Sequence, residues 1–448
     1  MVLLLLLFSF ALGVQYIFLT PPWQAPDEIT HYEYIDILSR AKLFQIKQDS
    51  DYKLQKKIIR SMDQFNAWKY VFKDRPSPLP KRFWSLPVYS GSNTKTKRPP
   101  LYYISGSIVL KIFNTDNLLL KHYLMRLFSL FLSLFTILFA YLAARTVFDN
   151  NCYYSFTAAC FVAFLPQFLI MSGTINSDSL ANMIGAASIY TFLFSLKHSK
   201  NYYILLLFPF LIILGLLTGR TTFFIVPSLA IFSIIYLLKT RKKSKYTALL
   251  FVLTGFIAIT AAYFIFKHIF PDLGARIATN ILEILRNFGR LFQKSFYASF
   301  THYKTTLLRS FWYYSGWMVF RFPDYIYGIL TVFSLFGVIG LIKYIAAELL
   351  KRKDRHPVKL DCFLLLFSIS FLAFIGLMFR LVSSASPMSR YIFPALPALA
   401  ILFVVGLKEL IPCKLEKMVL TVLIFLLVIL NTYAIFGHLT NAFYFRLW

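Results

Sequence analysis

Long segments without a charged residue are the feature that most constrains how this chain can fold. Val2–Leu19 and Leu127–Ala144 are two of them. Each is close to the roughly 20 apolar residues that an α-helix needs to cross the hydrocarbon core of a membrane. Of the 448 residues, 58% are hydrophobic and 15% are charged, whereas a soluble domain carries about 25% charged residues. The sequence therefore predicts an integral multi-pass membrane protein, with the lipid bilayer as its first partner.

The charged residues are strongly biased toward cations. The 47 Lys and Arg against 19 Asp and Glu give a net charge of +28, a balance that would favour nucleic-acid binding in a soluble chain. Because the apolar segments confine this excess to loops, we predict no nucleic-acid partner. The cysteines lie in or beside apolar segments and form no CxxC pair. Neither a disulfide framework nor a zinc site is therefore predicted for Cys152, Cys160, Cys362 and Cys413.

One segment, Leu101–Phe113, decides the topology. It is too short to cross the membrane and is more typical of a helix at the interface. If it does not cross and the N-terminus is cytoplasmic, three basic runs at 197–200, 239–245 and 350–359 all face the cytoplasm, in agreement with the positive-inside rule. We therefore predict an all-α polytopic membrane protein with about 11 transmembrane helices, near residues 2–20, 122–147, 152–171, 177–197, 202–218, 221–238, 246–266, 325–346, 361–380, 391–411 and 418–438.

This topology gives one transmembrane domain, residues 1–448, with two segments on the outer side. The first, residues 21–121, contains Leu101–Phe113 as a juxtamembrane helix. The second, residues 267–324, has apolar side chains at helical spacing between Ile281 and Phe292, with polar side chains opposite. This spacing predicts an amphipathic helix that lies on the membrane surface or packs within an external subdomain.

An acidic pair, Asp27-Glu28, directly follows the first apolar segment and its prolines. One carboxylate of such a pair can act as a general base on an incoming hydroxyl while the other orients a partner or holds a cation. His31 would share a face with Asp27 if a helix begins near Ala25, and the three side chains could supply hard ligands to a divalent metal ion. The alternative is a helix N-terminus, whose dipole favours acids in the first turn.

Basic residues also border apolar segments on the predicted outer side. Arginine suits phosphate because its planar fork binds two oxygens at once. Several arginines at one depth could therefore bind a lipid phosphate, although a single boundary arginine more often extends to headgroups. The candidates are Lys97, Arg98, Arg126, Arg220 and Arg390.

Polar and aromatic motifs accompany these cations. Asn176 and Asp178 could contact a substrate, but the sequence favours a capping role for Asp178, since Ser177 or Asp178 would cap the helix that follows well. Trp312 and Trp317 could stack on a sugar ring, although aromatic residues at this depth usually form the interfacial belt.

These motifs resemble those of the GT-C superfamily of membrane glycosyltransferases, which take a sugar from a polyprenyl-phosphate carrier. They resemble more closely a bacterial membrane-protein family of unknown function that is grouped with that superfamily. The resemblance spans most of the chain and rests on five motifs: Pro26-Asp27-Glu28 with His31, Arg98-Pro99-Pro100-Leu101-Tyr102-Tyr103, Asn176-Ser177-Asp178, Trp312 through Trp317, and Arg390-Tyr391 with Pro394.

The resemblance implies that Asp27 is the catalytic base, with Glu28 as its neighbour, in a reaction that inverts the anomeric carbon. It implies a polyprenyl-phosphate sugar donor, a glycan, lipid or protein acceptor, and a bacterial cytoplasmic membrane with the site facing outward. Metal use varies across the superfamily, so a divalent ion stays open. The candidate substrate-binding residues are His31, Lys97, Arg98, Tyr102, Tyr103, Arg126, Asn176, Asp178, Arg220, Trp312, Trp317, Arg390 and Tyr391.

Other functions compete with transfer. A lipid-linked glycan flippase or transporter would need polar groups near the bilayer midplane, whereas the charges of this chain gather at the predicted outer boundary. A polymerase of lipid-linked glycans would share the donor and the outer arginines. A non-catalytic assembly protein could keep the same fold.

Overall fold

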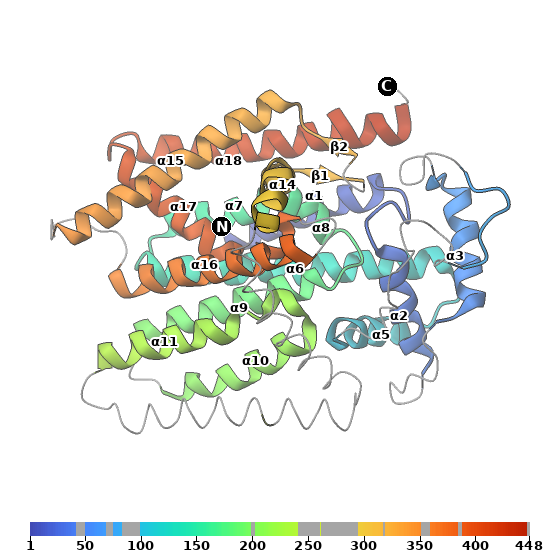
Figure 1. Ribbon diagram of the computed structural model, residues 1–448, viewed down its shortest axis with the longest axis horizontal. Coiled ribbons are helices and arrows are strands. Elements are labelled where there is room, and N and C mark those ends of the chain that lie inside the picture. Colours follow the sequence, from blue (N-terminus) through green and yellow to red (C-terminus); the bar gives the residue numbers. More distant parts are fainter. Residues whose placement is uncertain are drawn as a thin grey trace.

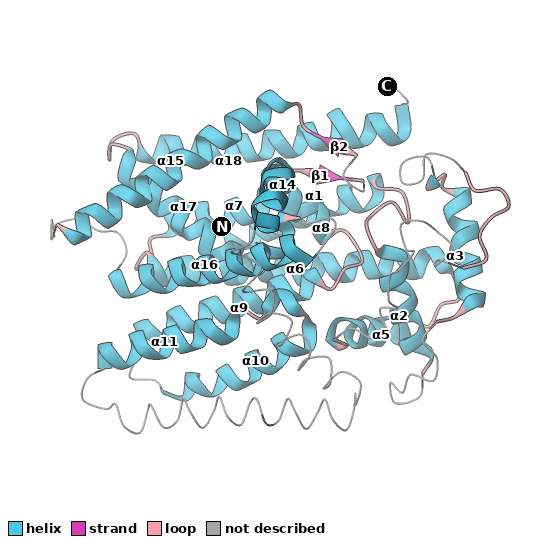
Figure 2. Cartoon of the chain, in the orientation of Figure 1, coloured by secondary structure: helices cyan, strands magenta, loops and turns pink. Residues whose placement is uncertain are grey.

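The structure is a computed structural model. It describes residues 1–41, 50–68, 75–82, 99–198, 202–240, 260, 294–316, 319–350, 359–383 and 388–445. Nearly all of these residues that belong to regular structure are helical (Figure 2). Within the described ranges, the strands are β1 (Tyr314–Ser315) and β2 (Phe320–Arg321), which pair antiparallel. The all-α class that the sequence predicts is confirmed.

Eight helices in the described residues are long and apolar enough to cross a membrane, and the bent pair α7 (Cys152–Phe164) and α8 (Pro166–Ser172) raises the number to nine. Three of the eight are continuous with a 3-10 or π-helical segment. The eight are α1 (Val2–Leu19), α6 (Leu118–Val147), α9 (Asp178–Lys197), η6 (Arg220–Thr222) with α11 (Ile225–Thr240), α15 (Asp324–Leu349), α16 (Leu360–Ser383), η7 (Ser389–Ala395) with α17 (Leu396–Leu410), and α18 (Glu416–Thr432) with η8 (Tyr433–Phe445).

Two of the predicted spans are not continuous full-length helices, and a third lies outside the described residues. The segment predicted at 202–218 forms η5 (Tyr202–Leu206) and α10 (Leu207–Thr218), whose apolar part is shorter than a full span. The segment predicted at 152–171 bends by 61° between α7 and α8. The span at 246–266 and the amphipathic helix expected between Ile281 and Phe292 lie outside the described residues.

Pro166 explains the bend, because proline has no N–H and forces the residue before it into an extended conformation. Leu165 is extended, with φ −67° and ψ 114°. The Phe164 carbonyl accepts a hydrogen bond of 2.7 Å from Asn431 Nδ2, and Asn431 Oδ1 accepts one of 2.9 Å from the Tyr16 hydroxyl. These bonds satisfy a backbone group that would be costly to leave unpaired in lipid.

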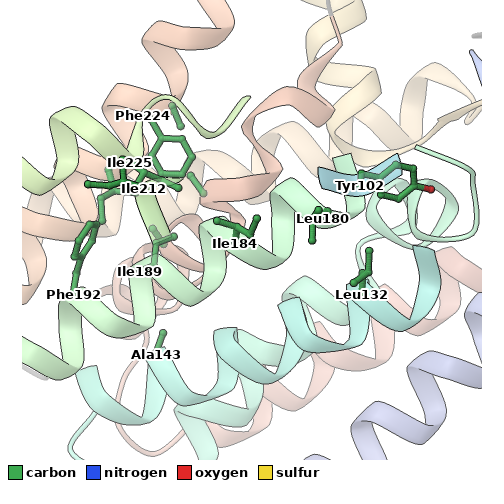
Figure 3. Packing of buried hydrophobic residues seen from close by; sticks show 14 of the residues in the cluster. Tyr102, Leu132, Ala143, Leu180, Ile184, Ile189, Phe192, Ile212, Phe224 and Ile225 are labelled. Carbon is green, nitrogen blue, oxygen red and sulfur yellow. The ribbon is translucent and has the colours of Figure 1, made fainter. Parts of the chain in front are cut away.

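The spanning helices approach closely where small residues line their contacts. A Cβ atom added to Gly340 of α15 would collide with the Gly406 carbonyl of α17, so these two helices touch backbone to backbone. Apolar side chains fill the wider contacts. Figure 3 shows Leu180, Ile184 and Ile189 along α9, above Leu132 and Ala143 of α6.

Helices shorter than the spans gather at one end of the molecule. They are α2 (Glu28–Arg40), α3 (Tyr52–Gln64) and α5 (Leu101–Phe113). Figure 1 shows α2 and α3 running across the direction of the spanning helices, with α2 lying between α3 and those helices. The helix α5 has the bounds that the sequence predicts. A further helix, α14 (Lys294–Trp312), packs on α16 and η7.

Candidate active site

Asp27 occupies the turn that joins α1 to α2. Its φ is 65°, in the left-handed region, and it precedes the first residue of α2 without capping that helix through its side chain. Aspartate is one of the few residues other than glycine that tolerate this conformation. The Thr30 hydroxyl donates to the Asp27 carbonyl at 2.9 Å, which fixes the turn. The half-buried Asp27 side chain therefore does not serve as a cap for its own helix.

A buried arginine lies close to Asp27 and to a second carboxylate. Arg390 of η7 is 5% exposed, and its Nε lies 3.6 Å from Oδ2 of Asp178, the first residue of α9. The guanidinium interacts electrostatically with both Asp178 and Asp27. Its Nη1 contacts the Met171 sulfur at 3.7 Å, while its Nε makes no hydrogen bond. We call Asp27, Asp178 and Arg390 the acid–arginine cluster.

Asn176 orients the start of α9. Its Oδ1 accepts the backbone N–H of Asp178 at 3.0 Å. Asn176 therefore caps the start of α9, a role that the sequence predicts for Ser177 or Asp178. The Ser177 side chain makes no capping hydrogen bond. The Asp178 carboxylate is consequently left to face Arg390.

Tyr102 and Tyr103 of α5 hold the neighbouring segments. The Tyr102 hydroxyl lies 2.7 Å from Ser129 Oγ and also bonds to the backbone of Asn176. Burial raises the pKa of Tyr102, so it stays protonated. The Tyr103 hydroxyl lies 2.9 Å from Nδ1 of His31, with the two rings stacked at 5.6 Å. His31 therefore packs on α5; it does not share a helical face with Asp27, because Asp27 is not helical.

Glu28 and Arg126 form a buried ion pair in which every donor of the guanidinium is used. Both side chains are 0% exposed. Arg126 Nε and Nη2 donate to the two Glu28 carboxylate oxygens, each at 2.8 Å. The other three N–H groups donate to backbone carbonyls at the end of α1, at distances of 2.9, 2.6 and 3.1 Å to Ile17, Thr20 and Pro21. A guanidinium has five N–H donors, so Arg126 has none left for a phosphate.

The Glu28 carboxylate also accepts two further bonds. The Ile175 backbone N–H lies 3.2 Å from Oε1, and His122 Nε2 lies 3.4 Å from Oε2. Burial alone would raise the pKa of Glu28, but the charges of Arg126 and His122 and their hydrogen bonds outweigh it and lower that pKa. Neither the catalytic role predicted for Glu28 nor the substrate-binding role predicted for Arg126 fits these contacts. The pair instead joins the end of α1, the start of α2 and the loop before α9.

Sequence reasoning missed His122, although a signal was present. His122 and Arg126 lie one helical turn apart in an otherwise apolar segment. Two polar side chains on one face of a spanning helix predict a polar partner from another segment.

The other predicted site residues differ in where they lie. Trp312 is 1% exposed and packs edge-on against Phe161 and Phe311, so its ring offers no face to a sugar, contrary to the prediction. Tyr391 lies beside two arginines: the centre of its ring is 4.0 Å from Arg380 Cζ and 5.4 Å from Arg390 Cζ. Arg220 is exposed in η6, which packs against α9 and η7 and so lies on the side of Arg390. Lys97, Arg98 and Trp317 lie outside the described residues.

The predicted metal ligands do not come together. Among the described residues, no group of three His, Cys, Asp or Glu side chains is arranged to hold a metal ion. The physical reason lies in the partners of Glu28 and His31, since the first is paired with Arg126 and the second with Tyr103.

Two solved structures have a similar fold. Both are crystal structures of the oligosaccharyltransferase of Archaeoglobus fulgidus. The one in complex with Zn and sulfate has a TM-score of 0.54 and 17% identity, over 96% of this chain and 52% of that chain. The one tethered by a disulfide bond to an acceptor peptide containing the NVT sequon has a TM-score of 0.54 and 15% identity, over 99% of this chain and 55% of that chain. Our chain thus spans about half the length of the oligosaccharyltransferase.

The fold and the spans therefore define a multi-pass membrane protein with the GT-C-like fold that the sequence predicts. At such low identity the likeness concerns the fold alone. Residues 10–399 match the family described as predicted membrane protein (DUF2142), and because the match covers most of the chain, the protein belongs to that family. Among curated proteins, no sequence matches this chain.

Proposed function

We propose that this protein is a membrane glycosyltransferase that moves a sugar from a polyprenyl-phosphate carrier to a glycan, lipid or protein acceptor, with inversion at the anomeric carbon. The observation that carries the proposal is the acid–arginine cluster, in which a half-buried aspartate lies near a buried arginine whose Nε makes no hydrogen bond. A base and a phosphate-binding cation in one place are what a displacement at a sugar phosphate needs.

In the proposed reaction, Asp27 takes the proton of an acceptor hydroxyl. The hydroxyl oxygen then forms a bond to the anomeric carbon of the donor sugar, and the bond between that carbon and the phosphate oxygen breaks. Both electrons of the broken bond leave with the lipid phosphate. Arg390 stabilises the additional negative charge on this phosphate, and Arg220 of η6 is a second candidate for this role.

Asp178 has a different part in this scheme. Its carboxylate faces Arg390 at 3.6 Å and holds the guanidinium in position before the donor arrives. Asn176 and Tyr102 keep Asp178 in place through the bond to its backbone N–H and through the hydrogen bond between Tyr102 and the loop. Asp178 is therefore a positioning residue and Asp27 the base.

The likeness of the fold to an oligosaccharyltransferase supports a glycosyl transfer, since that enzyme also acts on an acceptor, which in its case is a peptide. The basic runs at 197–200, 239–245 and 350–359 support an outward-facing site through the positive-inside rule. That the membrane is a bacterial cytoplasmic membrane is what the resemblance implies. Lys97, Arg98 and Trp317 remain candidates for contacts with the substrate, as the resemblance implies.

The test is consumption of a panel of synthetic polyprenyl-phosphate sugars by the purified protein in liposomes that also contain lysate acceptors. We expect the wild type to consume one donor and Asp27→Asn to consume none while it melts at the wild-type temperature. Asparagine suits the test because it removes the charge but tolerates the left-handed backbone. The control is Asp149→Asn, whose side chain is 63% exposed and pairs with Lys197. Consumption by Asp27→Asn at the wild-type rate would exclude Asp27 as the base.

Lack of consumption across the whole panel by folded protein would contradict the transfer itself. In that case a flippase or polymerase of lipid-linked glycans becomes the better proposal, and the same liposomes can be used to measure movement of the labelled donor between leaflets.

A further inference from the structure

The helix α3 has an exposed cationic side that the proposed reaction does not use. Its sequence places basic residues at i, i+3, i+4 and i+7, which is the spacing of one helical face. All four of these side chains are exposed: Lys53, Lys56, Lys57 and Arg60. At a rise of about 1.5 Å per residue they form a stripe about 10 Å long. Arg82 extends the stripe, because its guanidinium lies 4.2 Å from the ring centre of Tyr52.

The residues that the structure describes leave most of this charge uncompensated. The described residues 50–68 and 75–82 contain seven Lys and Arg but only Asp51 and Asp63 as acids. Both acids already have partners, Asp51 with Arg40 at 2.8 Å and Asp63 with Arg75 at 2.6 Å. The remaining basic side chains make no ion pair with any residue that the structure describes. We call them the cationic face: Lys53, Lys56, Lys57, Arg60, Lys81 and Arg82.

The opposite side of α3 is firmly attached to the rest of the protein. Gln55 Nε2 donates to Glu33 Oε1 of α2 at 2.8 Å, and Trp23 Nε1 donates to Ser61 Oγ at 3.0 Å. The apolar side chains of this side are all buried: Leu54, Ile58, Ile59 and Met62. The cationic face is therefore held in place before any partner arrives, which reduces the entropy cost of binding.

The orientation of α3 distinguishes between two kinds of anionic partner. Figure 1 shows α2 between α3 and the spanning helices. Because α3 uses one side to pack toward α2, its cationic side faces away from the spanning helices and hence away from the bilayer. This orientation favours a polyanion in the aqueous phase over anionic lipid headgroups as the partner of the cationic face.

We infer that the cationic face binds an anionic glycan chain, so that the acceptor of the transfer is a polyanion. This inference rests on the proposed function, because a glycosyltransferase needs an acceptor and a glycan is one of the proposed acceptors. The helix α2 connects Asp27 with α3. It begins directly after Asp27 and its 13 residues span about 20 Å. Its residue Glu33 accepts the hydrogen bond from Gln55 of α3. A chain held on α3 can therefore extend toward Asp27 and present a hydroxyl there.

The test measures binding of polygalacturonate, an anionic glycan, to the full-length protein in phosphatidylcholine nanodiscs at 50 mM and 200 mM NaCl, without any donor. The test variant carries Lys53→Gln, Lys56→Gln, Lys57→Gln and Arg60→Gln. The control variant loses the same number of exposed cations elsewhere, through Lys304→Gln, Lys343→Gln, Lys414→Gln and Lys417→Gln. Neutral dextran serves as the uncharged probe, and melting curves check that both variants fold.

We expect the test variant to bind polygalacturonate about tenfold more weakly at 50 mM NaCl, with a smaller loss in 200 mM NaCl, because exposed charges are screened by salt. The control variant should bind like the wild type, and no protein should bind dextran. Asp27→Asn should retain the binding, which separates this inference from the transfer itself. Equal affinity in the test variant, or an equal loss in the control variant, would overturn the inference. It is also overturned if the same substitutions abolish binding to phosphatidylglycerol liposomes but not to polygalacturonate.

Discussion

The buried pair of Glu28 and Arg126 permits a sharp separation between a structural and a catalytic role. The substitution Glu28→Gln keeps the shape of the side chain and an oxygen for the Ile175 N–H, but it removes the negative charge. Arg126 then keeps its three bonds to backbone carbonyls and loses its counter-ion. The substitution Arg126→Met removes all five bonds and leaves a buried carboxylate with His122 and one N–H as its partners.

The magnitudes follow from these contacts. Removing one partner of a buried ion pair costs about 3 to 5 kcal/mol. Glu28→Gln should lower the free energy of unfolding by about 3 kcal/mol, the lower limit, since the three carbonyls still solvate the guanidinium. Arg126→Met should lower it by about 5 kcal/mol, the upper limit. The double variant should lose about 2 kcal/mol less than the sum, because residues in direct contact are coupled.

The assay is equilibrium unfolding of the four proteins in mixed micelles between pH 5 and pH 8. Asp149→Asn is again the control, and it should cost less than about 1 kcal/mol because its ion pair is exposed. The pKa of Glu28 is lowered in the folded protein, so the pair stabilises the fold above the ordinary glutamate pKa of about 4.3. The difference between wild type and Glu28→Gln should therefore be constant across this pH range and shrink only as the pH falls well below 4.3.

A different result would restore the catalytic role that the sequence suggests. If Glu28→Gln unfolds at the same denaturant concentration as the wild type and yet loses transfer, the carboxylate acts on the substrate and our interpretation of the pair is refuted.

Three further predictions concern other contacts. Arg390→Ala should weaken donor binding about tenfold or more, since charge-assisted bonds to phosphate contribute about 1.5 to 3 kcal/mol. Arg390→Lys should restore part of this binding. Unchanged donor affinity in Arg390→Ala, measured with a fluorescent polyprenyl phosphate, would argue against a phosphate role. Burial raises the pKa of Glu33 to about 7 despite hydrogen bonds from Asp51 and Gln55, so the contact between α2 and α3 should weaken as the pH rises from about 4.3 to 7, by about 4 kcal/mol at most. The protection factors of residues 52–64 against hydrogen exchange, which correct for the intrinsic pH dependence of the exchange rate, should fall over that range. Protection factors that do not change with pH, or the same fall in Glu33→Gln, would contradict this. Gly340→Ala should cost about 1 to 3 kcal/mol by pushing a methyl group into the Gly406 carbonyl, whereas Gly376→Ala, which has open space around it, should cost little in the same unfolding assay.

Hydropathy was sufficient to locate most spanning helices, because a helix in lipid needs a long apolar segment whatever its neighbours are. The bounds of α5 were also predictable, since Pro99-Pro100 precede its first residue and Asn114 follows its last with φ 38°. The break at Pro166 was visible in the sequence but was interpreted as the middle of one span. Its direction depends on Asn431 and Tyr16, which lie far away in the chain.

The active-site prediction was limited by a different factor. Hydrophobic periodicity tells which face of an element is buried, but it does not tell which buried charge meets which. The partners Glu28 and Arg126 are 98 positions apart, so no local pattern distinguishes an arginine that stabilises the fold from one that meets a ligand. Arg126 and Arg390 looked alike in the sequence, and only their contacts separate them: five hydrogen bonds to protein atoms in the first case, and an Nε without a hydrogen bond in the second.

The different environments of Asp27 and Glu28 come from one backbone angle. Successive residues of a regular helix point about 100° apart, so two helical acids at these positions would have shared much of their surroundings. Asp27 has a φ of 65° and stands before the helix, whereas Glu28 is its first residue. The turn therefore directs Glu28 toward Arg126 in the protein interior and keeps Asp27 at a half-buried position near Arg390. Because Glu28 fixes the end of α1 and the start of α2 through Arg126, it also fixes the turn on which Asp27 stands. In our proposal the two acids therefore have different tasks: the buried carboxylate determines where the chain lies, and the one beside it acts on the substrate.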